Sequence, residues 1–391
     1  MKILVINCGS SSVKYRLFDI KNAKNFLLLA KGLIEKIGQR VSLFTHIPAD
    51  EEGLKKKKVN IHNHQEAISL IIKALVTNGR RGILQSKDEI GAVGHRVVHG
   101  AEEFTGSTLI TNDVVKSIKR SSRLAPLHNP PNLAGINAVK RIFGGVPQVA
   151  VFDTAFHQTL PRHAYLYGLP YKYYMKYHIR RYGFHGTSHR YVALEAAKKL
   201  KKPLNSLRLI TCHLGNGCSI TAVNRGKSID TSMGFTPLEG LLMGTRCGDI
   251  DPAIILYIMK TEKLNPDEMN DLLNKKSGLK GVSKVSSDMR DVLAAAKRGN
   301  KLAKTAFDIF IYRIKKYIGA YLAVMGGADA IIFTAGIGEN VEVVQNKALC
   351  GINRLIGKKT RILVIPTDEE LLIAQDTFAI VKKNKKQKGI K

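Results

Sequence analysis

The sequence predicts an α/β protein built from two related domains. Three observations lead to this prediction: apolar strand patterns alternate with helical ones, a strand, glycine turn and strand motif occurs twice about 205 positions apart, and no low-complexity linker interrupts the chain. A length of 391 residues suits two domains at about 100 to 200 residues each. An internal repeat of this length indicates duplication, so we expect two domains that face each other.

The first half opens with a hairpin. Alternating apolar and β-branched residues predict strands over 2–7 and 12–20, joined by a tight turn from Cys8 to Ser11. The elements expected after it are, in order, a helix at 65–78, a strand at 92–98, a helix at 132–143 and a strand at 148–152.

The second half repeats this opening. After a helix at 188–199, strands at 208–213 and 219–223 flank the turn from Leu214 to Gly217. The elements expected in the last third are an amphipathic helix at 301–325, a strand at 330–334, a turn at 335–340, a strand at 361–365 and a helix from Asp368.

The composition is that of a folded but strongly basic protein, with 62 Lys and Arg, 31 Asp and Glu, and a net charge of +31. The basic clusters at 55–58, 198–202 and 382–391 lack interleaved aromatic residues, so we expect no nucleic-acid partner. Anionic small molecules are the expected use of the positive charge.

The cysteines and the apolar runs indicate the compartment. Five cysteines without a CxxC pair are typical of reduced thiols rather than of a disulfide or zinc framework. No run of apolar residues reaches the length of a signal or membrane segment, so we expect a cytoplasmic protein without a membrane partner.

Three glycine-rich turns follow predicted strands: NCGSSSVK at 7–14, HLGNGCS at 213–219 and TAGIGENV at 334–341. Backbone N–H groups in such turns, with nearby hydroxyls and a lysine, can hold phosphate oxygens. Neither a complete GxGxxG motif nor a P-loop is present. The three turns together favour a bound nucleotide over ordinary hairpins.

A second group of residues has the composition of an anion site: Arg96, His128, Asp153, His185 and Arg246. They lie near small residues and predicted turns, away from any helical face, where functional side chains concentrate. A structural hydrogen-bonding role remains the alternative for each one. His185 and His189 have the i, i+4 spacing of a zinc protease, but no Glu follows His185, so metal hydrolysis is not favoured.

Nine segments spanning nearly the whole chain resemble the acetate kinase family: NCGSSSVKY, GHRVVHG, LAPLHNPPN, VAVFDTAFHQTLP, RYGFHGTSHRYV, HLGNGCS, DTSMGFTPLEGLLMGTRCGDIDP, VSSDMRDV and FTAGIGENV. The resemblance implies two duplicated ribonuclease-H-like domains of the actin-like ATPase fold with an interdomain cleft, and a homodimer. It implies reversible, direct in-line phosphoryl transfer between ATP and acetate, giving acetyl phosphate and ADP. The expected domains are 1–149 with 371–391, and a nucleotide-binding domain at 150–370.

The resemblance also implies roles for single residues. Arg96 is expected to bind the carboxylate, while His185 and Arg246 stabilise the transferring phosphoryl group. The acetate pocket would be formed by Val98, His128, Phe184 and Pro237. Mg²⁺, for which Mn²⁺ is expected to substitute, would lie near Asn7 and Glu369, with Glu370 as the next choice. The ATP-binding residues would be Ser10, Ser12, Lys14, His213, Leu214, Gly215, Asn216, Gly217, Asp288, Met289, Arg290, Gly336, Ile337, Gly338, Glu339 and Asn340.

Asp153 is treated in this family as a catalytic acid or base, but the chemistry favours another role. A carboxylate nucleophile has a reference pKa of about 4, so it is ionised at neutral pH and needs no general base. We therefore expect Asp153 to orient Arg96 or a Mg-bound water.

Three alternatives remain open from the sequence. A propionate or butyrate kinase would use the same scaffold, because one methylene in an apolar pocket changes discrimination by only about 1 to 3 kcal/mol. A non-catalytic nucleotide-switched binding protein would need the phosphate turns but not the two arginines and His185. A sugar kinase would need Asp153 as a true base and a polar pocket.

Overall fold

The computed structural model describes residues 1–22, 25–49, 53–76, 83–387 and 389. The chain forms two compact units: unit 1 comprises residues 1–155 and 368–391, and unit 2 comprises residues 156–367. The expected domain bounds put Asp153 and Glu369 in the second domain, whereas both belong to unit 1 in the structure.

Unit 1 is built on one mixed sheet with the strand order β5-β4-β3-β2-β1-β6-β8-β7. The opening hairpin pairs β1 with β2, and β1 also pairs in parallel with β6, which in turn pairs in parallel with β8. The strands are β1 (Lys2–Cys8), β2 (Ser12–Asn22), β3 (Asn25–Glu35), β4 (Ser42–Pro48), β5 (Leu54–Val59), β6 (Ile90–Val97), β7 (Thr108–Leu109) and β8 (Gln148–Phe152).

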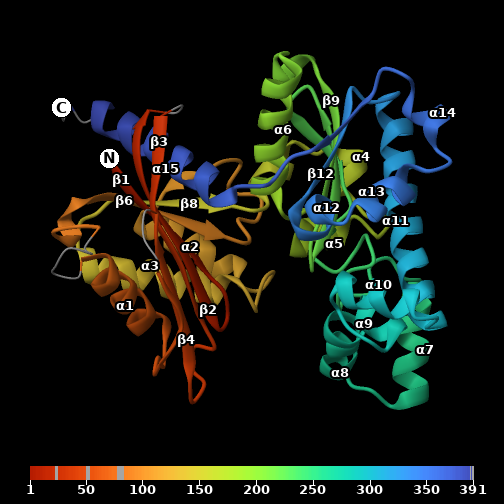
Figure 1. Cartoon of the computed structure of the whole chain (residues 1–391), viewed down its shortest axis with the longest axis horizontal. Helices are drawn as coiled ribbons and strands as arrows, with labels where there is room; N and C mark the ends of the chain where they lie inside the picture. The colour runs from red at the N-terminus through yellow and green to blue at the C-terminus, as the bar shows by residue number, and fades with distance from the viewer. Residues whose placement is uncertain (23–24, 50–52, 77–82, 388, 390–391) are drawn as a thin grey trace. The chain divides into compact units, whose positions relative to one another are not determined.

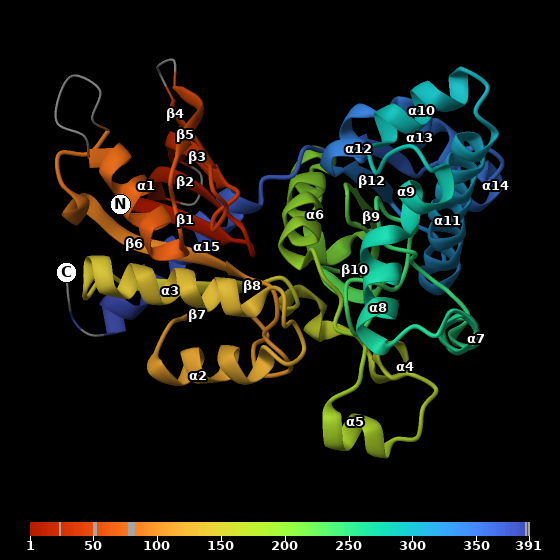
Figure 2. The same ribbon diagram turned by 90° about the horizontal axis from the view of Figure 1, so that it is seen from below.

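Helices cover both faces of this sheet (Figures 1 and 2). Helices α1 (His64–Val76) and α3 (Asn129–Phe143) pack on the face that includes Leu4, Ile6 and Val93. Helix α15 (Glu369–Gln387) packs on the other face, against β1, β2 and β6. Because both faces are covered, β1 is buried over four successive residues rather than alternately. The short helix α2 (Asn112–Ser121) packs against α3.

Unit 2 repeats the central five strands of unit 1. Its sheet has the order β11-β10-β9-β12-β13, in which β9 pairs antiparallel with β10 and parallel with β12. The strands are β9 (Arg208–Leu214), β10 (Cys218–Asn224), β11 (Lys227–Thr231), β12 (Ala330–Thr334) and β13 (Arg361–Val364). The order β3-β2-β1-β6-β8 in unit 1 has the same strand directions, so the predicted fold class of two duplicated α/β units is confirmed.

Helices α6 (Gly186–Leu200) and α11 (Lys301–Met325) lie on opposite sides of the second sheet (Figure 1). The remaining α-helices of unit 2 are α4 (Arg162–Tyr165), α5 (Lys172–Tyr177), α7 (Pro252–Glu262), α8 (Pro266–Asp271), α9 (Gly278–Ser283), α10 (Met289–Lys297), α12 (Ala335–Asn340), α13 (Glu342–Leu349) and α14 (Asn353–Ile356). Within the described ranges, no helix combines the length and the hydrophobicity of a membrane span.

Some expected elements were wrong or incomplete. The stretch 335–340, predicted as a turn, is the short helix α12. The basic cluster 55–58 lies in β5, an exposed edge strand, where lysines discourage pairing with another chain. The helix expected at 65–78 is present up to Val76, and its last two positions lie outside the described residues.

Candidate active site

Unit 1 brings Arg96 and Asp153 together at the ends of two parallel strands. Residues 96 and 97 at the end of β6 pair with 151 and 152 of β8, and the Asp153 N–H donates to the Val97 carbonyl at 3.0 Å. The Arg96 Nε donates to Asp153 Oδ1 at 3.0 Å, and its Nη2 donates to Oδ2 at 2.6 Å. Since Asp153 is only 2% exposed, this two-point contact fixes the plane of the Arg96 guanidinium.

Carboxylates surround Arg96. Glu369 Oε2 lies 3.6 Å from the Arg96 Nε. Burial raises the pKa of Glu369 to about 7; Arg96 opposes this rise, whereas the nearby Asp153 and Glu370 carboxylates add to it. Burial alone would lower the pKa of Arg96, but the Asp153 and Glu369 carboxylates raise it, so the guanidinium stays charged.

Lys14, expected near the phosphates, and Glu370, the second choice as a metal ligand, form an ion pair. Lys14 Nζ lies 2.6 Å from Glu370 Oε1, while Arg16 Nη1 donates to both oxygens of Asp368 at 2.8 and 2.9 Å. Burial would raise the pKa of Glu370, but Lys14 and Arg16 lower it. Glu370, the second choice as a metal ligand, is therefore held by two cations of β2. The negative charge of Glu369 is less well balanced by nearby cations than that of Glu370.

The donor set of unit 1 fits a hard divalent cation. Among the described residues no group of three or more His, Cys, Asp or Glu side chains is arranged around one metal position. Mg²⁺ takes only one or two protein oxygens and keeps several waters, so a sparse set is what it needs. The raised pKa of Glu369 marks a half-buried carboxylate that a nearby cation would stabilise in its charged form.

The loop after β6 is held by asparagines of α3. The Val98 N–H donates to Asn132 Oδ1 at 3.0 Å, and the same amide donates to the Cys8 carbonyl in the first glycine-rich turn at 2.8 Å. His128 occupies the N-cap position of α3 and is half-buried. In the first glycine-rich turn, the Gly9 N–H donates to the Ser12 carbonyl, and Ser10 is exposed.

Unit 2 fixes His185 from two sides. This residue precedes α6 with a left-handed backbone, φ 57°, a strained conformation for a residue other than glycine and one that clusters at functional sites. Its Nδ1 lies 2.9 Å from Ser219 Oγ, and its ring stacks on His213 with centroids 4.2 Å apart. His213 Nδ1 in turn lies 2.8 Å from Ser188 Oγ.

Arg246 and His185 converge beside the second glycine-rich turn. A Cβ built on Gly217 would lie 3.5 Å from both His185 Nε2 and Arg246 Nη1. The Arg246 Nη1 also donates to the Pro237 carbonyl at 3.1 Å. The missing side chain at Gly217 thus leaves open a point that an imidazole nitrogen and a guanidinium both face, two groups that can neutralise phosphoryl charge.

A cavity of about 540 Å³ opens next to this turn. It is lined by Gly215, Asn216, Ser287, Asp288, Met289, Arg290, Gly336, Ile337, Asn340 and Val341. Eight of these ten residues belong to the predicted ATP-binding set, and Ser287 and Val341 are additions. The size and the mixed polar and apolar lining suit a nucleoside.

Two residues of the predicted nucleotide set have contacts within the protein. Glu339 Oε1 accepts the N–H groups of Ala335 and Thr367 at 2.7 and 3.1 Å, so it ties the start of α12 to the chain after β13. Gly338 packs against β9. Neither residue is among those that line the cavity.

Asp288 and Arg290 line the cavity but also hold each other. The Asp288 carboxylate accepts the Arg290 backbone N–H at 2.9 Å and caps α10. Arg290 Nη2 lies 2.5 Å from Asp288 Oδ2, and these hydrogen bonds lower the pKa of Asp288 to about 2.

A model of the acetokinase family matches residues 2–360. The acetate kinase of Desulfitobacterium hafniense is 55% identical over 403 residues, covering 98% of this chain and 100% of that protein. The chain belongs to the acetokinase family. The acetate kinase of Halothermothrix orenii is 54% identical, covering 97% of this chain and 100% of that protein.

Two solved structures extend the likeness to the fold. The acetate kinase of Porphyromonas gingivalis has a TM-score of 0.90 at 43% identity, covering 97% of this chain and 99% of that one. A propionate kinase from Francisella tularensis has a TM-score of 0.89 at 41% identity, with the same coverage. The predicted family, fold and carboxylate kinase function are confirmed. A kinase needs a nucleotide and, generally, a divalent metal ion.

Several residues that shape the acetokinase site lie inside the recognised segments, but the sequence assigns them no role. Asn132, Ser219 and Ser188 act through tertiary hydrogen bonds to the site residues. Their partners are far away in sequence, so no spacing rule could identify them. The polar residues Ser219 and Ser188 are fully buried, which is a property of the fold rather than of the sequence.

Proposed function

We propose that this protein catalyses reversible, direct in-line phosphoryl transfer between Mg-ATP and acetate. The observation that carries the proposal is the convergence of His185 Nε2 and Arg246 Nη1 on one point beside Gly217. The same turn supplies Gly215 and Asn216 to the nucleoside-sized cavity. A nucleotide in that cavity would therefore present its phosphates to His185 and Arg246.

The acceptor chemistry fits Arg96. An acetate carboxylate is already a nucleophile at neutral pH, so the protein must bring one anion to another rather than remove a proton. Arg96 supplies a fixed positive charge, and Asp153 holds its guanidinium at two points. Arg246 and His185 would neutralise the charge of the phosphoryl group as the bond to ADP breaks and the bond to the carboxylate forms.

Mg²⁺ is the cation proposed for this reaction, with Mn²⁺ as a substitute and Asn7 and Glu369 as the residues that hold it. When bound, it would neutralise charge on the nucleotide phosphates. Glu369 is supported by its half-buried position near two other carboxylates and by its raised pKa. Asn7 is half-buried at the end of β1, next to the first glycine-rich turn.

The test is phosphoryl transfer from Mg-ATP to acetate, propionate, butyrate and glycerol, with acyl phosphates trapped as hydroxamates. We expect transfer to acetate, with losses of at least about 100-fold for Arg96→Ala and for Arg246→Ala, the size seen when a charge-stabilising donor is removed. Binding of ATP without transfer to any carboxylate would instead support a nucleotide-switched binding protein.

A propionate kinase is the second candidate. The likeness to the Francisella tularensis propionate kinase structure supports it, because this likeness is nearly as close as that to the acetate kinase structure. The proposed methyl pocket includes buried Phe184 and half-buried Val98 and Pro237. The ratio of kcat/KM for acetate to that for propionate separates the two candidates.

We also infer a homodimer from an exposed apolar face of unit 2. On α7, Leu256 is 71% exposed and Tyr257 is 70% exposed, next to Ile254. Large exposed apolar side chains in one place are typical of association surfaces. Light scattering on the eluting protein tests this, and Leu256→Glu should shift a dimer to a monomer.

A further inference from the structure

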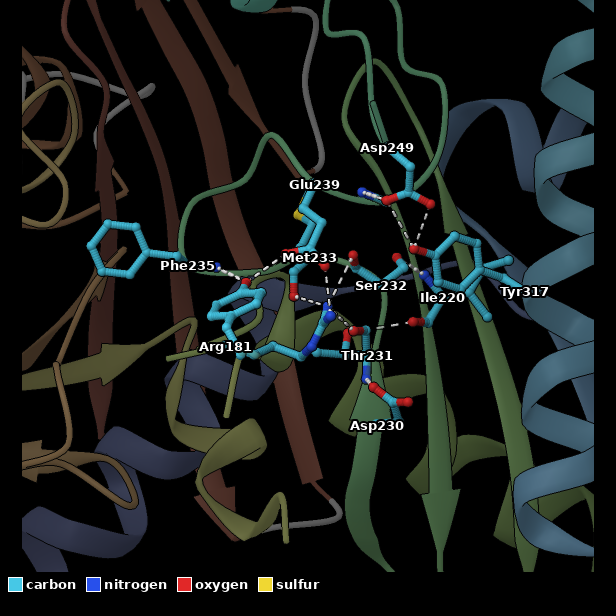
Figure 3. Close-up of polar contacts among 12 residues, drawn as sticks. Arg181, Ile220, Asp230, Thr231, Ser232, Met233, Phe235, Glu239, Asp249 and Tyr317 are labelled. Atoms are coloured by element: carbon cyan, nitrogen blue, oxygen red, sulfur yellow. Dashed lines mark hydrogen bonds and ion pairs between the residues drawn. The ribbon is translucent and has the colours of Figure 1, made fainter. Parts of the chain in front are cut away.

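Arg181 is bonded on several sides within unit 2, just before the segment that carries Phe184 and His185. Its Nη1 donates to the Thr231 carbonyl at 2.8 Å and to the carbonyls of Ser232 and Met233, both at 3.3 Å (Figure 3). Its Nη2 donates to Glu239 Oε1 at 2.6 Å. One guanidinium thus holds both ends of the segment 231–239.

A tyrosine completes this arrangement. The Tyr167 hydroxyl donates to Glu239 Oε2 at 2.5 Å and accepts the Phe235 N–H at 2.8 Å. A Cβ on Gly234 would lie 1.7 Å from Glu239 Oε2 and 2.2 Å from the Tyr167 oxygen, so the backbone approaches this pair closely. The middle of the segment is therefore fixed as well as its ends.

The segment contacts the proposed site at two points. The Pro237 carbonyl accepts a hydrogen bond from Arg246 Nη1. The Gly234 carbonyl accepts the N–H groups of Tyr182 and Gly183 at 3.1 and 3.2 Å, immediately before Phe184 and His185. A shift of this backbone would move the Arg246 guanidinium directly, and it would also loosen the chain that leads to His185.

We infer that Arg181 and Glu239 are positioning residues for phosphoryl transfer, which hold the segment 231–239 so that the Pro237 carbonyl fixes the Arg246 guanidinium. This inference rests on the proposed function, because it assigns Arg246 to the phosphoryl group. Arg246 uses one N–H of Nη1 for the Pro237 carbonyl and keeps its other N–H donors, including the second one on Nη1, for the anion. A misplacement of about 1 Å can cost about 100-fold in rate, so the holding contacts matter for kcat.

An arginine is required at position 181 by the geometry. Its planar fork donates to three carbonyls and a carboxylate from nitrogens that point in different directions. A lysine offers one nitrogen and cannot serve both ends of the segment. Arg181→Lys therefore keeps the charge opposite Glu239 and removes the holding function.

The first experiment compares Arg181→Lys and Tyr167→Phe with the wild-type enzyme. Nucleotide titration counts folded sites, and kcat is expressed per site. We expect kcat to fall about 10- to 100-fold for Arg181→Lys and about 3- to 10-fold for Tyr167→Phe. Mg-ADP affinity should stay within about twofold, because no contact of Arg181 involves the nucleoside cavity. An unchanged kcat per site in both variants overturns the inference.

The matched control is Arg208→Lys. Arg208 also donates from Nη1 to two backbone carbonyls of unit 2, those of Met325 and Gly326, at 3.1 and 2.8 Å. Arg208→Lys should lower the free energy of unfolding but leave kcat per site unchanged. If Arg208→Lys lowers kcat as much as Arg181→Lys does, the effect is a general consequence of losing such bonds, and the inference fails.

A double-mutant cycle with Arg246 tests whether the holding contacts act through Arg246 or independently of it. The single amine of a lysine at position 246 cannot bind the Pro237 carbonyl and face the phosphoryl group at the same time. In the Arg246→Lys background the position of Pro237 therefore no longer matters, and adding Tyr167→Phe should lower kcat by less than about twofold. Full additivity would overturn the inference while leaving Arg246 in the proposed reaction. Wild-type activity of Arg246→Ala would instead defeat the proposed function itself.

Discussion

At the scale of single residues, the contact between Arg96 and Asp153 bears on the expected role of Asp153. Both oxygens of Asp153 are engaged by Arg96, and the side chain is almost fully buried at the end of β8. A general base needs a lone pair within reach of the proton that it removes, and Arg96 already occupies one lone pair on each oxygen of Asp153. The geometry therefore agrees with the orienting role expected from the chemistry of a carboxylate nucleophile.

Asp153→Asn should impair the reaction without a steep dependence on pH. The Asn amide would turn an N–H towards the Arg96 Nη2, so Arg96 would lose its orientation. A hydrogen bond to a charged group contributes about 1.5 to 3 kcal/mol, so kcat/KM for acetate should fall about 10- to 150-fold. Profiles of rate against pH check this, with Asp113→Asn, an exposed residue of α2, as the control. A loss that varies steeply with pH would indicate proton transfer instead.

The sequence predicted more of the site residues than of the residues that hold them in place. Long motifs with distinctive residues led to Arg96, His185 and Arg246, and the structure gives each of them specific contacts. Arg181 and Glu239 lie inside two of the same segments, but the segments do not show their role, since these two residues act through backbone carbonyls and each other. Only the folded chain brings these two residues, 58 positions apart, together.

At the scale of elements, the docking of α15 on the sheet of unit 1 brings Glu369 to Arg96. This helix packs across β6 at Gly94, where a Cβ would lie 2.5 Å from Thr377 Oγ1 and 2.8 Å from Ile373 Cγ2. Gly94 therefore lets the helix approach the strand closely. The start of the helix is tied to β2 by the pairs of Lys14 with Glu370 and of Arg16 with Asp368.

Gly94→Ala should destabilise unit 1 by displacing α15. Overfilling a packed interior costs about 1 to 3 kcal/mol, and because the helix carries Glu369, acetate kinase activity should fall with stability. Gly319→Ala on α11 is the control, since nothing lies within 4 Å of a Cβ there. The free energy of unfolding in urea measures both variants, and equal stability of Gly94→Ala and wild type would contradict this packing argument.

The elements that were predicted correctly are those with a strong local pattern. The strands β1 and β9 and the helix α11 have clear apolar periods, and the bounds of α11 agree with the expected 301–325. The strand β5 has no such pattern, because its sequence LKKKKV is exposed throughout except for the half-buried Val59. The helix α12 contains two glycines, and it depends on the Glu339 carboxylate that accepts the Ala335 N–H.

At the scale of the whole molecule, buried imidazoles make the fold sensitive to acid. Burial lowers the pKa of His95 and of His157 to about 4, and it lowers that of His189 further below its ordinary range. His157 uses both ring nitrogens in the neutral form, since Nε2 donates to the Phe184 carbonyl and Nδ1 lies 2.8 Å from Ser228 Oγ. Both units contain such groups, so both should respond to pH.

The stability of the protein should therefore fall as the pH falls from about 6.5 to about 4. Over that window the unfolded chain binds protons on these histidines and the folded chain does not. Each such group removes about 1.4 kcal/mol per pH unit. Thermal unfolding at about pH 7.5 and about pH 5 measures the loss, which should be smaller in His157→Gln than in wild type and unchanged in the control His62→Gln, a residue on the surface.

Salt distinguishes this mechanism from repulsion within a chain of net charge +31. Protonation of carboxylates adds to that charge at low pH, so repulsion also lowers Tm as the pH falls. Raising the ionic strength from about 0.02 M to about 0.3 M shortens the screening length to well under 10 Å and weakens repulsion between exposed charges. Salt hardly changes the free-energy cost of protonating a buried imidazole. Most of the decrease in Tm with falling pH should therefore persist at high salt. A decrease that disappears at high salt would assign acid sensitivity to the surface charge and not to the buried histidines.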